Sequence, residues 1–326
     1  ARQLCPYIQI FYFPSLALDL IKNDYSIFHV HSVPSNHYDL AFFISKIKNT
    51  PLFVTAHYSP NDLDLITKSK IHSLYWNIWM KFSLRHVTKL LAIVNSEKER
   101  FHRYWCIPNE KIEVIPNGID LNEFDNISNE DVEAFKGRYK IYGKRLILMV
   151  GRLARSKGAD ILITAVAPLL KRYEDLVVML VGPIQESNFL IYLHNLIVRY
   201  NIGDKVIITG KLPRRDVLSA YECSSVVVLP SRGEVFGITL IEGMYLKKIV
   251  IGSDSGGIPD VIKHNVNGFL FKSENHADLR KKLEYILDNY TGLEHIAING
   301  HREVLKNYNW KILSKRIRDL YLSAMK

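Results

Sequence analysis

Cysteine is scarce in this chain of 326 residues. Its three cysteines, Cys5, Cys106 and Cys223, are odd in number and widely spaced, and none stands in a C-x-x-C or histidine-paired arrangement. The pattern indicates neither a disulfide framework nor a zinc site. A reducing, cytoplasmic setting is the simplest interpretation.

Long apolar runs, a signal peptide pattern and low-complexity segments are also missing. No stretch of 18 or more apolar residues occurs, so the sequence predicts no membrane-spanning helix. Apolar material is nevertheless plentiful, at 48% hydrophobic and 11% aromatic residues. The chain can therefore bury large cores, and its length allows two domains of ordinary size.

Acidic residues are outnumbered, which gives a net charge of +10. Residues 1–143 contain 16 Lys and Arg against 15 Asp and Glu, whereas residues 144–326 contain 27 against 18. The basic excess thus lies in the second half and indicates an anionic partner. Nucleic acid is disfavoured, because the lysines are dispersed and basic residues do not alternate with aromatic residues along a pair of strands.

Short apolar runs alternate with helical patterns along the whole chain. This alternation is typical of parallel sheets with helices on both faces. Strands are predicted near residues 8–13, 27–31, 52–56, 90–95 and 112–115 in the first half, and near 146–151, 176–181, 206–209, 225–229, 248–252 and 269–271 in the second. Three helices are predicted after Asn275. The polar stretch 125–144 between the halves predicts a short helix and connector, with the domain boundary near residue 140.

The most informative segment joins a predicted strand, 224–231, to a predicted helix. Apolar spacing changes from strand-like to helical at the sequence EVFGITLIEGM, which contains Phe236 and Gly237. In an open α/β sheet such a turn is where ligands bind. The N–H groups of Phe236, Gly237 and Ile238 would be uncapped donors for an anion such as a diphosphate.

Two carboxylates eight positions apart flank this turn. We expect Glu234 in the loop and Glu242 about two turns into the helix, so that both reach hydroxyls of one bound molecule, as a sugar nucleotide would require. The pair alone supports a second interpretation equally well. Glu234 could simply interact with the helix dipole, and Glu242 could be a solvated helix residue.

Two cations follow the predicted strand 146–151. Arg152 and Lys157 lie just past its end and beside a helix that starts after Gly158. Guanidinium binds phosphate in a bidentate manner and ammonium binds it as a point charge, so the two residues form a candidate diphosphate clamp. Glycines at this and the later strand ends would let a ligand approach the backbone closely; they are Gly151, Gly182, Gly210, Gly256 and Gly257.

Three histidines of the first half lie within or directly after predicted strands. His29 and His31 alternate within a predicted strand and are expected to be structural. His57 follows the next strand and precedes a turn signal, Tyr58-Ser59-Pro60, which places it at a carboxyl end. From the residues alone, a structural role is still the better-supported interpretation of His57.

Segment 66–89 mixes aromatic residues with five Lys or Arg residues. We favour a packed helix whose aromatic side chains face the core. A helix of this composition can also lie on an anionic bilayer, so a membrane contact stays open. The aromatic residues are Tyr75, Trp76, Trp79 and Phe82.

Several segments in register resemble a known family. The order VGRLARSKG, LVGP, PSRGEVFGITLIEGM, SDSGGIPDVI and NGFLF is similar to the C-terminal half of the retaining glycosyltransferases of family 4. IFHVHS, LFVTAHYSP, LLAIVNSEKE and IEVIPNGIDLNEF extend the resemblance over nearly the whole chain. It implies a GT-B fold, in which two Rossmann-like α/β domains with parallel sheets face a cleft. Residues 1–140 would form the acceptor domain and 141–308 the donor domain, with a last helix, 309–326, packing back on the first.

The resemblance also assigns roles to individual residues. Arg152 and Lys157 would hold the donor diphosphate, with Gly182 in the same donor site. Glu242 would hold the nucleotide ribose, and Glu234 would contact the donor sugar. The turn from Phe236 to Thr239, which includes Gly237 and Ile238, would supply backbone donors. His57 would lie over the reacting centre, which makes His57 and Glu234 the catalytic candidates.

The implied reaction moves a hexose from a UDP- or GDP-sugar to a hydroxyl of a glycan or lipid-linked acceptor, with retention. Because no D-x-D motif stands at a strand end, the cations and helix N-termini would neutralise the diphosphate without a metal or other cofactor. Two alternatives remain, a sugar-nucleotide epimerase or hydrolase and a donor-binding module without turnover. The protein would be cytoplasmic, with a peripheral contact at the inner membrane face as an open possibility.

The start of the chain departs from the family pattern. Family members open with a strand and a Gly-rich loop, whereas this sequence begins at Ala1 with a segment that resembles the region after the second strand. The first strand is central in the Rossmann order. We therefore expect the chain as given to have a weakened first domain and little transferase activity.

Overall fold

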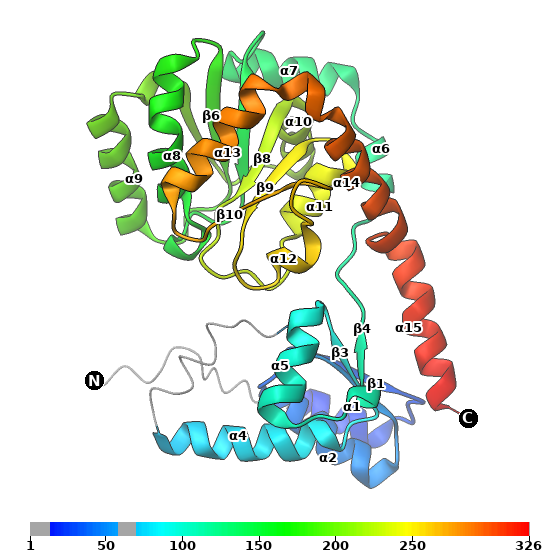
Figure 1. Cartoon of the computed structure of the whole chain (residues 1–326). Coiled ribbons are helices and arrows are strands. Elements are labelled where there is room, and N and C mark those ends of the chain that lie inside the picture. Colours follow the sequence, from blue (N-terminus) through cyan, green and yellow to red (C-terminus); the bar gives the residue numbers. More distant parts are fainter. Residues whose placement is uncertain (1–13, 58–69, 326) are drawn as a thin grey trace. The chain divides into compact units, whose positions relative to one another are not determined.

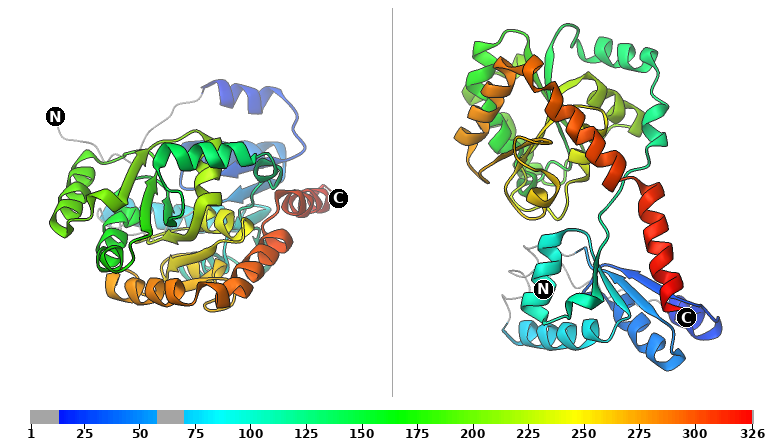
Figure 2. Two further views of the ribbon diagram at one scale, coloured as in Figure 1. Left: turned by 90° about the horizontal axis from the view of Figure 1, so that it is seen from above. Right: turned by 45° about the vertical axis from the view of Figure 1, so that its right-hand side comes forward.

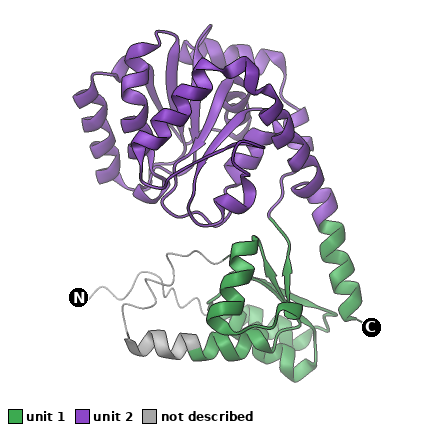
Figure 3. Ribbon diagram, in the orientation of Figure 1, with its two compact units in different colours: residues 1–116, 314–326 green, residues 117–313 purple. Residues whose placement is uncertain are grey.

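The computed structural model describes residues 14–57 and 70–325, excluding the side chains of residues 70–77 (Figure 1). The chain divides into two compact units (Figure 3). Unit 1 consists of residues 1–116 and 314–326, and unit 2 of residues 117–313. Each contains one parallel sheet with packed helices, which confirms the predicted pair of Rossmann-like α/β domains.

Unit 1 has a sheet of order β1-β2-β3-β4 in the part of the chain described. All its strand pairs are parallel. The strands are β1 (Phe28–His31), β2 (Leu52–Thr55), β3 (Lys89–Ala92) and β4 (Ile112–Val114), and the helices are α1 (Pro14–Lys22), α2 (Asn36–Lys48), α4 (Lys70–Arg85) and α5 (Asn95–Trp105). The strands predicted between 27 and 115 are confirmed, although β3 is shorter than expected. The strand predicted at 8–13 lies outside the described residues.

Unit 2 has a six-stranded sheet of order β10-β9-β8-β5-β6-β7, again with every pair parallel. All six predicted strands are confirmed within one or two residues at each end. They are β5 (Arg145–Val150), β6 (Leu176–Val181), β7 (Val206–Gly210), β8 (Ser224–Leu229), β9 (Ile249–Ser253) and β10 (Phe269–Phe271). Because every pair of strands is parallel, all six carboxyl ends lie along one edge of the sheet.

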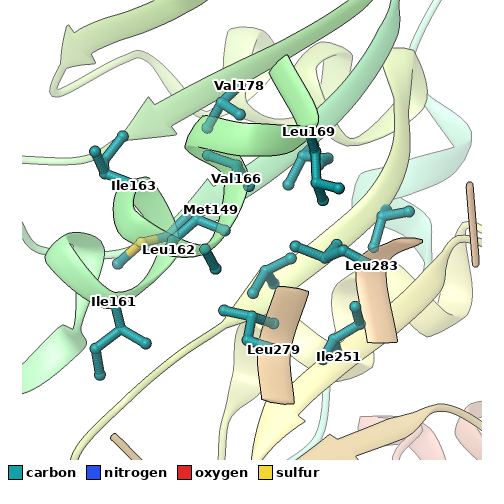
Figure 4. Packing of buried hydrophobic residues seen from close by; sticks show 14 of the residues in the cluster. Met149, Ile161, Leu162, Ile163, Val166, Leu169, Val178, Ile251, Leu279 and Leu283 are labelled. Atoms are coloured by element: carbon teal, nitrogen blue, oxygen red, sulfur yellow. The ribbon is translucent and has the colours of Figure 1, made fainter. Parts of the chain in front are cut away.

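The helices of unit 2 cover both faces of this sheet (Figures 1 and 2). α8 (Ala159–Arg172), α9 (Ser187–Tyr200) and α13 (His276–Asp288) share a hydrophobic core on one face. Figure 4 shows Leu162 of α8 and Leu279 of α13 near Met149 of β5. The remaining helices are α6 (Asn122–Asp125), α7 (Asn129–Tyr139), α10 (Arg214–Cys223), α11 (Ile238–Tyr245), α12 (Ile258–Val261), α14 (Glu294–Asn307) and α15 (Trp310–Ala324).

The unit boundary differs from the expected one near residue 140. α7 lies within the stretch 125–144, which is predicted to hold a short helix and connector, and it packs on α10 of unit 2. Its Asp131 and Arg138 form ion pairs of 2.5 Å with Arg215 and Asp216 of α10. These contacts group residues 117–140 with the second unit.

The last helix, α15, passes from one unit to the other. Its residues up to Leu313 group with unit 2, and those from Ser314 group with unit 1. Within unit 1, the ring of Tyr321 packs 4.9 Å from that of Phe53, and its hydroxyl bonds to His29. None of the described helices combines the length and apolar character needed to cross a membrane.

Candidate functional site

Loops from four strands meet at the carboxyl edge of the unit 2 sheet, and their backbones interlock. Gly257 N–H donates to the carbonyl of Glu234 at 2.8 Å, and Arg232 N–H donates to Ser156 at 2.8 Å. The loops after β5, β8 and β9 are therefore fastened to one another. Sequence analysis placed these turns along one sheet edge, and the strand order confirms it.

Three glycines of these loops lie against the backbone of a neighbouring loop. An added Cβ would lie 2.0 Å from the Pro230 carbonyl oxygen at Gly158, and 1.9 Å from the Gly151 carbonyl oxygen at Gly182. At Gly256 it would lie 1.9 Å from the Glu234 carbonyl oxygen. The backbone of a neighbouring loop thus packs directly against each of these three glycines. Gly151 and Gly210 have no atom within 4 Å of an added Cβ and keep open space.

Lys157 and Glu234 are 77 residues apart and form an ion pair. Lys157 Nζ donates to Glu234 Oε2 at 2.5 Å. The two side chains are only 18% and 16% exposed, so the pair is well shielded from water. Arg152, from the same loop as Lys157, is exposed and donates to Gln185 Oε1 at 2.9 Å. Both candidate phosphate ligands thus lie on the loop after β5, and Glu234 balances the charge of one.

The turn before α11 has the expected open N-terminus. Gly237 is the N-cap residue, with φ 92°, and no side chain caps the helix. Ile238 and Thr239 form the first turn, while the Phe236 side chain is buried and its ring lies 5.6 Å from that of Tyr308. An uncapped first turn presents backbone N–H groups suited to an anion.

The position of Glu242 in its helix and its burial both differ from what the sequence predicted. It is the fifth residue of α11, about one turn into the helix and not two, and it is only 6% exposed. Arg214 pairs with its Oε1 at 2.7 Å, and the Tyr221 hydroxyl donates to its Oε2 at 2.7 Å. The solvated alternative is wrong, and the carboxylate already has a protein partner on each oxygen.

Arg214, Tyr221 and Arg232 are site neighbours that sequence analysis missed. Arg232 makes a bidentate pair with Asp160 at 2.8 and 2.9 Å, which ties the loop after β8 to the start of α8. Arg214 and Tyr221 stand seven residues apart on α10 and therefore share a helix face. The spacing of Arg214 and Tyr221 could have indicated in the sequence that they act together. For Arg232, the only sequence indication was its closeness to Glu234.

Three histidines gather at the carboxyl ends of β1 and β2 in unit 1. His31 Nδ1 lies 3.1 Å from His57 Nε2, and the two rings stack at 5.3 Å. The ring of His29 lies 4.4 Å from that of His31, and its Nε2 is 2.8 Å from Thr55 Oγ1. His29 is thus anchored within the unit. His31, expected to be structural, contacts the catalytic candidate directly. Residues 58–60, the predicted turn, lie outside the described residues.

Burial keeps this cluster neutral. Burial, together with the neighbouring His31 and His57, lowers the pKa of His29 to about 4. Burial also lowers the pKa of His31, and burial together with His31 lowers that of His57. At neutral pH all three rings are therefore uncharged hydrogen-bonding groups.

Unit 1 should consequently lose stability in mild acid. The unfolded chain binds a proton at His29 near pH 6.5, whereas the folded chain resists it until about pH 4. The His29 contribution is therefore full above about pH 6.5 and falls as the pH approaches 4, by at most about 3 kcal/mol. Denaturant unfolding between pH 4 and 7 should show a shallower pH dependence in His29→Gln than in the unchanged protein. His86→Gln, at an exposed residue directly after α4, is the control and should leave the slope unaltered.

Comparison with known proteins identifies the family. A model described as "Glycosyl transferases group 1" matches residues 131–303, more than half of the chain. A second, "Glycosyltransferase Family 4", matches residues 3–123. An uncharacterized glycosyltransferase of Methanocaldococcus jannaschii, MJ1607, is 30% identical over 240 residues, which are 73% of this chain and 60% of that protein. The D-inositol 3-phosphate glycosyltransferase of Nocardiopsis dassonvillei is 29% identical over 63% of this chain and 48% of its own. The chain thus spans about half to 60% of these two relatives.

Solved structures agree. A glycosyltransferase from Rickettsia africae superposes with a TM-score of 0.82 at 25% identity, over 97% of this chain and 83% of that one. HepE from Anabaena, solved in complex with UDP and glucose, gives 0.81 at 21% identity, over 95% and 82%. The resemblance seen in the sequence is confirmed, and the chain belongs to the glycosyl transferases group 1 family, with the GT-B fold.

Proposed function

We propose that this protein is a retaining glycosyltransferase that moves a hexose from a UDP- or GDP-sugar to a hydroxyl of a glycan or lipid-linked acceptor. The observation that carries the proposal is the Lys157–Glu234 pair, 2.5 Å apart, on loops next to the uncapped start of α11. A cation and a helix N-terminus suit a diphosphate, and a carboxylate suits sugar hydroxyls. Because HepE has also been solved in complex with UDP-glucose, UDP-glucose is the first donor to test.

The side chains would divide the donor between them. Arg152 and Lys157 bind the diphosphate, and their charges together with the α11 N-terminus neutralise it without a metal. Glu234 contacts the sugar, and Glu242 contacts the ribose. The open space beside Gly151 leaves room for a ligand near the clamp, whereas Gly182 contributes by holding the Gly151 loop. In unit 1, the neutral His57 ring is assigned to a hydrogen bond with donor sugar or acceptor.

A panel of UDP- and GDP-sugars tests this proposal. The expected result is thermal stabilisation by one nucleotide class, slow hydrolysis, and faster nucleotide release when an acceptor is added. Turnover without an acceptor dependence would favour the epimerase or hydrolase alternative. Binding without any turnover would favour a donor-binding module, and binding of neither class would overturn the proposal.

The clamp is tested on the same panel. Arg152→Ala and Lys157→Ala should each weaken donor binding by about 1.5–3 kcal/mol, the usual contribution of a hydrogen bond to a charged group. Lys171→Ala, at the other end of α8, removes the same charge away from this edge and should have no effect. Unchanged donor affinity in both clamp variants would contradict the assignment.

A second part of the proposal is a peripheral membrane contact through unit 1. α2 and α4 expose a group of large apolar side chains, Phe43 at 56%, Ile47 at 80%, Ile78 at 62% and Phe82 at 51%. Trp79 links them, because its ring stacks on Phe43 at 5.4 Å and lies 6.0 Å from Phe82. Lys46, Lys81 and Arg85 stand on the same two helices. Apolar side chains flanked by cations are typical of a surface that lies on anionic lipid.

The packed-helix interpretation holds for only part of this surface. Trp79 is half-buried and donates its indole N–H to Asp39 at 2.6 Å, as a packed residue would. Tyr75 and Trp76 are outside the part of the chain whose side chains are described. The packed-helix interpretation does not explain why Phe43 and Phe82, beside Trp79, are exposed.

Sedimentation with lipid vesicles checks the membrane contact. The protein should pellet with vesicles of anionic lipid more than with purely zwitterionic ones. The double variant Phe43→Ser/Phe82→Ser should reduce the bound fraction several-fold, because it removes apolar area that the lipid would bury. Tyr192→Ser, an exposed aromatic residue of unit 2, is the control. Equal binding by the double variant and the unchanged protein would contradict the contact.

A further inference from the structure

Glu242 is held on both sides by residues of α10. Arg214 pairs with Oε1 and Tyr221 donates to Oε2, each at 2.7 Å. The carboxylate is only 6% exposed, so water cannot replace either partner easily. Its orientation is therefore set by these two side chains.

Arg214 is in turn held by the segment that follows the unit boundary. Its Nε donates to Glu123 Oε2 at 3.0 Å, and its guanidinium lies 5.5 Å from the ring centre of Phe124. Both residues belong to α6. The guanidinium is thus fixed between two carboxylates, one on α6 and one on α11, and beside an aromatic ring. Such an arginine has little freedom to leave Glu242.

Tyr221 remains a donor at any ordinary pH. Burial and the adjacent Glu242 carboxylate raise the pKa of Tyr221 well above its usual value. Its hydroxyl also lies 3.3 Å from the carbonyl oxygen of Thr239, in the first turn of α11. The tyrosine therefore connects Glu242 to the turn that opens the helix.

We propose that Arg214 and Tyr221 are positioning residues that orient Glu242 for the two hydroxyls of a ribose. A carboxylate offers about four acceptor positions, and the two protein donors occupy one on each oxygen. One position per oxygen remains, which matches a pair of adjacent hydroxyls. The inference rests on the proposed function, in which Glu242 binds the nucleotide ribose.

The test compares a nucleoside diphosphate with its 2′,3′-dideoxy analogue. The nucleotide is UDP or GDP, whichever binds the unchanged protein more tightly. That protein should prefer the natural nucleotide by tenfold or more, the least expected from a hydrogen bond to a charged group. Glu242→Gln and Arg214→Met should each reduce this preference several-fold while retaining affinity for the dideoxy analogue. Tyr221→Phe should reduce it less, because the charged partner, Arg214, still holds Glu242.

Further variants separate positioning from simple loss of structure. Arg215→Met removes the neighbouring arginine of α10, which pairs with Asp131 and not with Glu242, and should keep the full preference. Arg214→Lys should restore part of it. The double variant Arg214→Met/Glu242→Gln should be no worse than Glu242→Gln alone, since both act through one carboxylate. If Arg214→Met unfolds, Arg214→Lys and Tyr221→Phe carry the comparison.

The outcomes distinguish the positioning role of Arg214 and Tyr221 from the ribose-binding role of Glu242. If Glu242→Gln loses the preference while Arg214→Met and Tyr221→Phe keep it, the positioning inference is wrong and the proposed function stands. If Glu242→Gln keeps the preference, the ribose assignment is itself wrong, and the inference falls with it. Absence of nucleotide binding in the unchanged protein would overturn both.

Discussion

Replacing Gly256 by alanine is expected to abolish measurable nucleotide binding and to destabilise unit 2 by about 3 kcal/mol or more. Gly256 has φ 62°, a conformation that costs about 1 kcal/mol or more for alanine. Its added Cβ would lie 1.9 Å from the Glu234 carbonyl oxygen and 3.0 Å from the Glu234 nitrogen. Both are backbone atoms, so the loop that bears Glu234 must move. Thermal unfolding and nucleotide titration would measure the two effects.

Gly143 supplies the matched control. It also has positive φ, 65°, but an added Cβ meets nothing within 4 Å. Gly143→Ala should therefore show only the conformational cost, about 1 kcal/mol, and bind nucleotide normally. Equal behaviour of the two variants would show that the loops after β8 and β9 do not depend on their close backbone contact.

Glu234→Gln is expected to reduce transfer by about 100-fold or more while sparing free nucleotide. The carboxylate would stabilise positive charge that develops on the sugar in the transition state, and such electrostatic interactions contribute several kcal/mol in a site shielded from water. Free UDP or GDP lacks the sugar. Removing Glu234 also frees Lys157 from a 2.5 Å ion pair and takes a negative charge away from the diphosphate. Nucleotide affinity should therefore be unchanged or up to about tenfold tighter.

Steady-state kinetics and calorimetry on the same preparation would separate these effects. Glu222, on α10, pairs with Lys248. Glu222→Gln removes an equal charge away from the site and is the control. A variant that binds free nucleotide poorly but turns over normally would show that the roles of Glu234 and Glu242 are exchanged.

Periodicity predicted the sheets because their strands are buried on both faces. β6 reads LVVMLV and every residue is buried, so the strand could be located without its neighbours. β3 ended sooner than its apolar run, which continues to Val94. The Ile93 N–H donates to the Glu97 carboxylate at 2.7 Å, and this bond to a helix residue takes the place of a ladder bond. Apolar composition alone does not predict that this N–H bonds to a side chain and not to a neighbouring strand.

The boundary between the units also differs from the one predicted near residue 140. The polar stretch 125–144 predicts a short helix and connector, and it contains α7, which begins with a capping box at Ser128 and Asp131. That helix stays on unit 2 through charged partners on α10. A linker and a helix held by ion pairs are equally polar, so hydrophobic patterning cannot separate them.

The sequence by itself determined which residue types stand at which strand ends: cations after β5, a carboxylate and glycines around α11, a histidine after β2. The positions of the strand ends follow from local sequence, namely from the spacing of apolar residues and from the turn residues. Only the tertiary structure decided which of them touch. Lys157 meets Glu234 because β5 pairs with β8, although β6 and β7 lie between these strands in the sequence and the two residues are 77 positions apart. Glu242 is buried because α10 places Arg214 and Tyr221 against α11, and His31 meets His57 because β1 pairs with β2. Strand pairing depends on contacts throughout the core between residues far apart in the sequence, so no local sequence pattern specifies it.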